Sequence, residues 1–198
     1  MGTAALVSRP RRALIAETAP GISRRAIMRG LATAAVPVLA AHARPAAAEA
    51  IASPVQPQDA GFMRAAIALA AQADFPFGAV IVRDGKIVAR GLNLGRHLQD
   101  PTAHGEMVAI RRFLAEQGPA ALRGTTLYTS GEPCVMCMGA IAWCGIARVV
   151  YGASLAQLGA AIDQIMIPTT EVAAKTEFAK IAITGGVLAD EAMALFHR

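Results

Sequence analysis

The sequence lacks a surplus of basic residues once its first fifty positions are set aside. The 198 residues include 19 Lys and Arg against 14 Asp and Glu, and the first fifty hold seven arginines, no lysine and two acidic residues. Residues 51–198 therefore carry twelve residues of each sign. Because proteins that bind nucleic acids normally carry a basic surface, this balance counts against a nucleic-acid partner.

The first fifty residues also lack an apolar run long enough to cross a bilayer comfortably. A basic segment with paired arginines (23–29) is followed by a modest apolar stretch (30–43) and by small residues spaced as in an Ala-x-Ala cleavage site. This order predicts a signal peptide over residues 1–50, cleaved after Ala48 or Ala50. An uncleaved membrane anchor or a basic tail is the alternative.

Cysteine is scarce as well, with three residues in all, and two of them form Cys134-x-x-Cys137 directly after Pro133. Together with His104 they offer three ligands that suit Zn²⁺, and three protein ligands leave the fourth tetrahedral position open for water. A structural zinc site usually closes its shell with a fourth Cys or His, but Cys144 lies two helical turns beyond Cys137. The set therefore predicts an open, catalytic Zn²⁺ site, where zinc makes water a nucleophile near neutral pH.

Glu106 lies two residues after His104 and is the candidate catalytic residue. A carboxylate close to the water, but not on the metal, can take its proton, pass it to a ring nitrogen and later protonate the departing amine. The alternative is an acidic residue placed at a helix start by the helix dipole. His-x-Glu followed by Pro-Cys-x-x-Cys is the general signature of zinc deaminases that act on bases.

Periodicity and turn residues predict one α/β domain over residues 61–198, preceded by a linker at 51–60. The order of elements describes a mixed five-stranded sheet with helices on both faces, a three-layer α/β/α sandwich. Both ligand segments are expected in the first turn of a helix, where partial positive charge favours anionic ligands. Helices are expected at 61–73, 102–116, 133–144 and 189–197, strands at 79–83, 86–90, 125–129, 147–151 and 181–188, and a partly helical region at 155–180.

Two motifs, at residues 100–107 and 128–141, resemble those of the cytidine-deaminase-like superfamily, except that Gly105 replaces the more usual alanine. Within the superfamily, residues 76–85 and 128–141 look most like bacterial guanine deaminases. Residues 148–153, together with the glycine-rich segment near the C-terminus, look more like tRNA adenosine deaminases. The resemblance implies a Zn²⁺-dependent deaminase with the sandwich fold described above, and it implies a homodimer.

Two departures from the tRNA adenosine deaminases bear on the substrate. Those proteins carry a basic Lys-Thr-Gly loop and a basic C-terminal helix that hold RNA, whereas this sequence has Gln157-Leu158-Gly159 and ends at His197-Arg198. These departures argue against tRNA. Guanine deaminases resemble one another in a C-terminal aspartate and an aromatic residue that close over the base, and Asp163 is the candidate for that aspartate here.

The leader and the metal site are mutually consistent. Residues 23–29 resemble the twin-arginine export signal, with Ile27 and Arg29 as relaxed versions of the usual Phe and Lys, which implies a periplasmic protein. By that resemblance the protein is exported already folded, so zinc can be loaded in the reducing cytoplasm before the two cysteines meet an oxidising compartment. No membrane contact is expected once the signal is cleaved.

Four residues are candidates for substrate contact: Phe77, Asn93, Ala103 and Trp143. The Asn93 amide can read a base edge or can be an ordinary turn residue, and the two aromatic rings can stack on a base or pack in the core. Hydrolytic deamination of a small free base or nucleoside is predicted, with guanine, converted to xanthine and ammonia, as the first choice. Cytosine and an adenosine-type substrate are alternatives, and a catalytically idle zinc-binding module is the alternative of another class.

Overall fold

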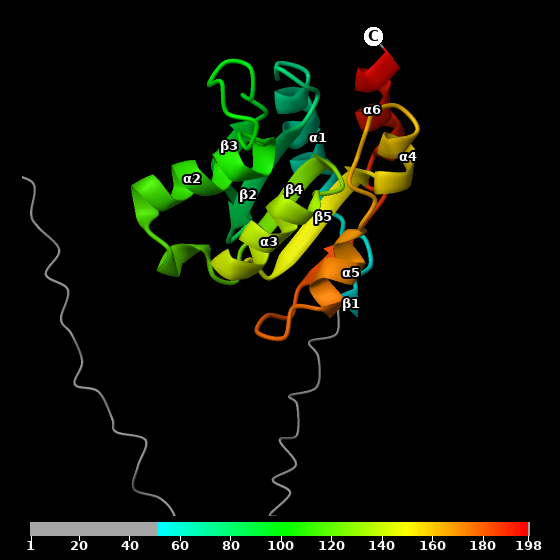
Figure 1. Cartoon of the computed structure of the whole chain (residues 1–198). Coiled ribbons are helices and arrows are strands. Elements are labelled where there is room, and N and C mark those ends of the chain that lie inside the picture. The colour runs from blue at the N-terminus through cyan, green and yellow to red at the C-terminus, as the bar shows by residue number, and fades with distance from the viewer. Residues whose placement is uncertain (1–50, 198) are drawn as a thin grey trace, which may run out of the picture. The chain divides into compact units, whose positions relative to one another are not determined.

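The computed structural model describes residues 51–197, and the expected signal peptide at 1–50 lies outside them. One six-stranded sheet runs through this domain in the order β1-β6-β5-β4-β2-β3 (Figure 1). Strand β2 is antiparallel to both β3 and β4, whereas the pairs β4–β5, β5–β6 and β6–β1 are parallel, so the expected mixed sheet is confirmed. The strands are β1 (Ile51–Ala52), β2 (Gly78–Arg83), β3 (Lys86–Leu92), β4 (Thr126–Gly131), β5 (Arg148–Ala153) and β6 (Ala182–Thr184).

Helices cover both faces of the sheet, which confirms the three-layer sandwich (Figure 1). Alternate residues of β2 divide between two cores: Ala79 and Ile81 belong to the core beneath α2 and α3, and Val80 and Val82 belong to the core beneath α1. This alternation follows from the two-residue period of a strand. The helices are α1 (Asp59–Ala70), α2 (Gly105–Gln117), α3 (Val135–Cys144), α4 (Leu155–Gly159), α5 (Thr169–Ala174) and α6 (Ala189–Met193), with short 3₁₀ turns η1 (Ala120–Leu122) and η2 (Ala194–His197).

Glycine-containing turns end the elements where the sequence predicts. Asp84 and Gly85 join β2 to β3 with φ angles of 51° and 70°, the left-handed conformation that a two-residue hairpin turn needs. Gly145 ends α3 at a φ of 72°, and glycine is favoured there because it has no Cβ to oppose that conformation.

The segment 51–60, expected to be a linker, is part of the domain. β1 adds a sixth strand to the five expected, with Ile51 opposite Ala182 of β6. The Ser53 amide then donates to the Ile183 carbonyl over 2.7 Å, and α1 begins at Asp59. A two-residue strand contains no detectable alternation of apolar and polar residues, so β1 could not be predicted from the sequence.

The ambiguous region 155–180 consists of two short helices, α4 and α5, and Pro168 is the residue that precedes α5. Residues 160–168, which join them, contain no helix or strand. β6 is shorter than the predicted strand at 181–188 because Gly185 leaves the sheet. Among residues 51–197, no helix combines the length and the apolar character needed to span a membrane.

Candidate active site

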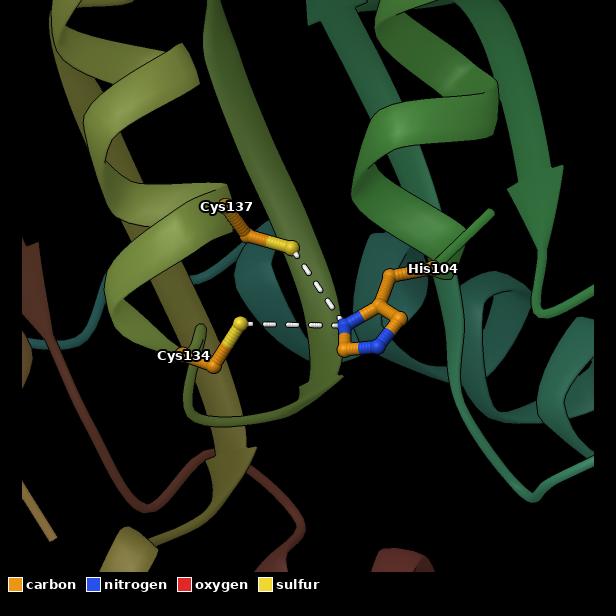
Figure 2. Close-up of side chains that lie close together, drawn as sticks. All are labelled: His104, Cys134 and Cys137. Atoms are coloured by element: carbon orange, nitrogen blue, oxygen red, sulfur yellow. Dashed lines mark hydrogen bonds between the residues drawn. The ribbon is translucent and has the colours of Figure 1, made fainter. Parts of the chain in front are cut away.

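The starts of two helices bring the three predicted metal ligands together. His104 immediately precedes α2 and Cys134 immediately precedes α3, while Cys137 lies in the first turn of α3. Side chains at these N-cap positions often cap the helix by accepting a hydrogen bond from a backbone amide of its first turn, but the structure records no such cap bond for His104 or Cys134. Their side chains point toward each other across the gap between the helices instead (Figure 2).

The distances between the ligand atoms fit a zinc ion. His104 Nδ1 lies 3.7 Å from the Sγ of Cys134 and 3.6 Å from the Sγ of Cys137, and the ligand atoms of the three residues lie within 4.8 Å of one another. Typical Zn–S and Zn–N bonds at a tetrahedral angle place sulfur and nitrogen about 3.6 Å apart. The described part of the chain contains no fourth His, Cys, Asp or Glu in this group, so the ligand set is that of an open site.

Electrostatic coupling prepares one of the two thiols for metal binding. Hydrogen bonds with Cys137 and, to a smaller extent, with His104 lower the pKa of Cys134 to about 4, although burial acts in the opposite direction. The hydrogen bond between the two cysteines, together with burial, raises the pKa of Cys137. Metals bind the thiolate form, so the lowered pKa of Cys134 favours metal binding, and the Cys137 proton must leave when a metal binds.

Glu106 lies beside the ligand cluster in the first turn of α2, and its side chain is buried. Its Oε1 accepts a hydrogen bond from the Thr129 hydroxyl over 3.2 Å, and its Oε2 accepts one from the Cys137 thiol over 3.6 Å. Burial raises the pKa of Glu106. The carboxylate also lines a cavity of about 30 Å³ that it shares with His104 and Cys134, a volume that holds about one or two waters.

A larger pocket of about 590 Å³ opens in front of the metal ligands. Asn93 contributes to its wall, and its Oδ1 accepts a hydrogen bond from the Gly95 amide over 3.0 Å. The Asn93 backbone is fixed too, because its amide donates to the Phe77 carbonyl over 2.9 Å. This arrangement leaves the Asn93 Nδ2 as a donor for a bound molecule. The pocket is lined by Phe75, Phe77, Asn93, His104, Cys134, Ile162, Asp163, Gln164 and Ile165.

The other candidate contact residues differ in their relation to this pocket. Phe77 lines it and packs edge-on against Phe196, with ring centroids 5.3 Å apart. Ala103 is fully buried and does not line the pocket, and its carbonyl accepts a hydrogen bond from the Leu94 amide. Trp143 does not line the pocket: its side chain is 76% exposed and stacks on Phe178. The structure therefore brings Phe77 and Asn93 to the site, but not Trp143.

Several lining residues were not among the sequence candidates. Phe75 could have been chosen as a candidate from the sequence, because it lies two residues before Phe77 in the same aromatic segment. Ile162, Gln164 and Ile165 carry no periodic signal, since they belong to the irregular segment between α4 and α5. Asp163, the candidate for the C-terminal aspartate, lies in the same stretch and lines the pocket.

Comparisons with known proteins agree with this geometry. The model of the cytidine and deoxycytidylate deaminase zinc-binding region matches residues 56–153. Over 100 residues the chain is 43% identical to the tRNA-specific adenosine deaminase of Streptococcus pyogenes serotype M18 (strain MGAS8232), which covers 50% of this chain and 63% of that protein. Over 78 residues it is 51% identical to the guanine deaminase of Bacillus subtilis (strain 168), which covers 39% of this chain and 50% of that protein.

A solved structure supports the same relationship over a longer stretch. It comes from studies of A-to-I editing by tRNA:A34 deaminases and matches with a TM-score of 0.58 at 31% identity, covering 68% of this chain and 98% of that chain. The chain spans less than two thirds of the length of either curated relative named above. The matched region is a zinc-binding deaminase region, and it contains His104, Cys134 and Cys137, which are positioned to bind a metal ion. The chain therefore belongs to the cytidine-deaminase-like superfamily.

Proposed function

We propose that this protein is a zinc-dependent hydrolytic deaminase of a free nucleobase or nucleoside, with guanine as the first-choice substrate and xanthine and ammonia as products. One observation carries the proposal: a buried carboxylate, Glu106, lies against an open set of three zinc ligands at the base of a pocket. An aromatic ring, Phe77, and an amide, Asn93, line that pocket. These are the groups that bind a flat, polar ring and hydrolyse its amino substituent.

Each side chain has a role that follows from its position. His104, Cys134 and Cys137 would hold the zinc ion, which would supply Lewis acidity and lower the pKa of a bound water molecule. Glu106 takes a proton from the attacking water at Oε2, the oxygen that loses its hydrogen bond when Cys137 gives up its proton to bind the metal. It passes this proton to a ring nitrogen of the base as the C–O bond forms. It then moves the proton of the new hydroxyl group to the amine, which departs as ammonia when the C–N bond breaks. Asn93 Nδ2 donates to an acceptor on the edge of the ring.

The pocket has room for more than a base. A second hollow of about 350 Å³ adjoins it and shares Phe75, Asn93 and His104, with Arg96 and Gln99 on its outer side. A free base occupies the first pocket alone, whereas the sugar of a nucleoside would extend into the second. Both substrate sizes therefore belong to the proposal.

Two observations favour guanine over a tRNA as the proposed substrate. Residues 51–198 carry equal numbers of basic and acidic residues, whereas RNA-binding surfaces are normally basic. The identity to the Bacillus guanine deaminase, 51%, is higher than the 43% to the streptococcal tRNA-specific adenosine deaminase. The streptococcal match is longer, at 100 residues against 78, and it makes an adenosine-type substrate the second candidate. Cytosine is the remaining alternative.

Export to the periplasm and assembly into a homodimer are also part of the proposal. The twin-arginine segment at 23–29 supports export. The exposed Trp143 and Phe178, stacked 4.4 Å apart, offer a large aromatic surface that a second copy of the chain would cover. Sequencing of the N-terminus of the exported protein tests the cleaved export signal, and a start at residue 49 or 51 is expected. A start at residue 1 or 2 would contradict cleavage. Sedimentation of the purified protein tests whether it is a dimer.

Ammonia release from a substrate panel tests the function. The zinc-loaded protein is incubated with guanine, guanosine, cytosine, adenosine and a tRNA anticodon stem-loop, and its zinc content is measured in parallel. The fastest release is expected from guanine. Faster release from the stem-loop or from adenosine would select the second candidate. Bound zinc without ammonia from any compound would identify a zinc-binding module with no deaminase activity.

A further inference from the structure

Glu132 has no part in the proposed proton transfer, yet it lines the small cavity that His104, Glu106 and Cys134 share. It follows β4 directly and is separated from Cys134 by Pro133 alone. Its backbone amide donates to the Ala153 carbonyl at the end of β5 over 2.8 Å. The residue is only 7% exposed, and a buried carboxylate is costly unless hydrogen bonds satisfy it.

The Glu132 carboxylate is satisfied by the starts of two helices. Oε2 accepts a hydrogen bond from the Leu155 amide, the first residue of α4, over 2.7 Å. Oε1 accepts two bonds of 2.9 Å from Thr169, the first residue of α5, one from its amide and one from its hydroxyl. Hydrogen bonds to an ionised acceptor are about twice as strong as neutral ones. One side chain thus holds both helix starts.

The chain between those two anchors forms one wall of the substrate pocket. Ile162, Asp163, Gln164 and Ile165 all line the pocket from this segment (the connection between α4 and α5 in Figure 1). For residues 163–168, the structure records one backbone hydrogen bond donated within the chain, and it is local, from the Ile167 amide to the Ile165 carbonyl. The wall is therefore held mainly through its two ends, and both ends bond to Glu132.

We propose that Glu132 is a positioning residue that fixes this wall relative to the metal ligands and so sets the affinity for the substrate base. The inference rests on the proposed function, because it assigns the wall to that substrate. Glu132 lies two residues before Cys134, so a short piece of backbone joins the residue that anchors the wall to a metal ligand. The distance between the wall and the metal ligands therefore depends on the conformation of this piece of backbone. Asp163 and Gln164 are the polar groups whose placement depends on it.

Hydrogen exchange of the zinc-loaded full chain tests the structural step without any substrate. In Glu132→Gln an amide NH₂ replaces one of the two acceptor oxygens and faces a donor, so one helix start loses its partner. Amides of residues 155–169 are expected to exchange about tenfold faster or more, while those of α2 and α3 keep their rates and zinc content is unchanged. Unchanged exchange at 155–169, or equal acceleration throughout the domain, would overturn the proposal.

Steady-state kinetics on the best substrate of the panel test the functional step. Glu132→Gln is expected to raise KM by about tenfold and to change kcat by less than about threefold, because the loss falls on binding. Glu132→Asp keeps both acceptor oxygens on a shorter arm and should recover part of the loss. Glu171→Gln removes an exposed carboxylate from the same helix, α5, where it pairs with Lys175, and is the matched control.

A double variant separates positioning from a general structural effect. If Glu132 acts through the wall, combining Glu132→Gln with Asp163→Asn should raise KM by less than the product of the single effects. Independent, multiplicative effects would overturn this link. If no compound in the panel is deaminated, the proposed function fails while the exchange experiment still decides the anchoring. If exchange accelerates but KM does not rise, the substrate role of Glu132 is wrong and the deaminase proposal stands.

Discussion

The Cys137 thiol donates to Oε2 of Glu106 over 3.6 Å, so the carboxylate touches the metal-ligand cluster without belonging to it. On its other side, the Thr129 hydroxyl donates to Oε1 over 3.2 Å. Both oxygens therefore have fixed neighbours from α3 and β4. The bond from Thr129 remains when Cys137 loses its proton to a metal, so the fold orients the proposed proton carrier independently of the substrate.

Replacing Glu106 by Gln should therefore abolish turnover and leave the metal in place. The amide keeps the shape of the side chain and its bond from Thr129, but it cannot accept and release a proton. General acid–base groups contribute about 10²- to 10⁴-fold, and a loss of at least that size in ammonia release is expected, with zinc content unchanged. Glu116→Gln, an exposed carboxylate near the end of α2, is the control and should keep full activity. Residual activity above about a tenth of wild type would refute the role.

Removing zinc should inactivate the protein and lower its thermal stability. His104, Cys134 and Cys137 come from the starts of two helices, so a metal that binds all three holds those helices together and stabilises the folded state. Treatment with a chelator should abolish ammonia release, and added Zn²⁺ should restore it. Cys134→Ser should lose zinc in the same way. Cys144→Ser, which alters a cysteine outside the ligand group, should keep it; equal zinc loss in both variants would contradict the assignment.

The metal centre was predictable from the sequence because its parts are local. His104 and Glu106 lie two residues apart, Cys134 and Cys137 three apart, and each pair falls at the start of a helix that its own neighbourhood specifies. The chemistry of thiols and imidazoles then selects the metal. The hairpin at 84–85 was predictable for the same reason, since Asp-Gly favours the turn without help from distant residues.

The pocket wall at 160–168 was not predictable, because long-range bonds position it. Its shape depends on Glu132, which bonds Leu155 and Thr169 from 23 and 37 residues away. The exposed position of the Trp143 ring, away from the pocket, was not predictable either. Its spacing on α3 allows core packing or substrate stacking, and the outcome depends on which segments cover that helix. Phe178 lies against it and leaves the ring 76% exposed.

Acid should weaken the domain through Asp59, which is fully buried at the start of α1. Burial raises the pKa of this carboxyl, but hydrogen bonds from Arg148, the Gln56 amide and Tyr128 outweigh burial, so the pKa lies below its ordinary value. A lowered pKa means that the ionised form stabilises the fold above the unfolded pKa of about 4, and that this contribution is lost as pH falls through the folded value. Arg148 is the main partner of the Asp59 carboxylate, to which it donates two hydrogen bonds of 2.8 Å.

Asp59→Asn isolates this contribution. At pH 7 the variant should lose about 3–5 kcal/mol of unfolding free energy, because the buried Arg148 is left without its counter-charge. The difference from wild type should shrink as the pH is lowered below about 4. Urea unfolding of both proteins between pH 7 and 3 measures it. Proton uptake by the zinc ligands is common to both proteins and cancels in the difference. A difference independent of pH would show that Asp59 does not titrate with folding.

Close packing between β3 and the start of α2 sets the position of His104, which immediately precedes α2. A Cβ on Gly91 would lie 2.1 Å from the Gly105 carbonyl oxygen and 2.4 Å from the Ala109 amide nitrogen, and both are backbone atoms that cannot move alone. Gly91→Ala must therefore push the start of α2 away from the sheet. Overpacking of this kind costs about 1–3 kcal/mol or more. Because His104 and Glu106 lie at that helix start, zinc affinity should fall together with stability.

Gly61→Ala provides the matched control for Gly91→Ala. Gly61 lies in α1, and a Cβ there would meet no atom within 4 Å. Replacing a helical glycine by alanine in open space should stabilise the fold by up to about 1 kcal/mol, with zinc affinity unchanged. Urea unfolding and competition for Zn²⁺ with a chelating dye measure both quantities. If Gly91→Ala keeps wild-type stability and zinc affinity, the contact between β3 and α2 does not position the ligand.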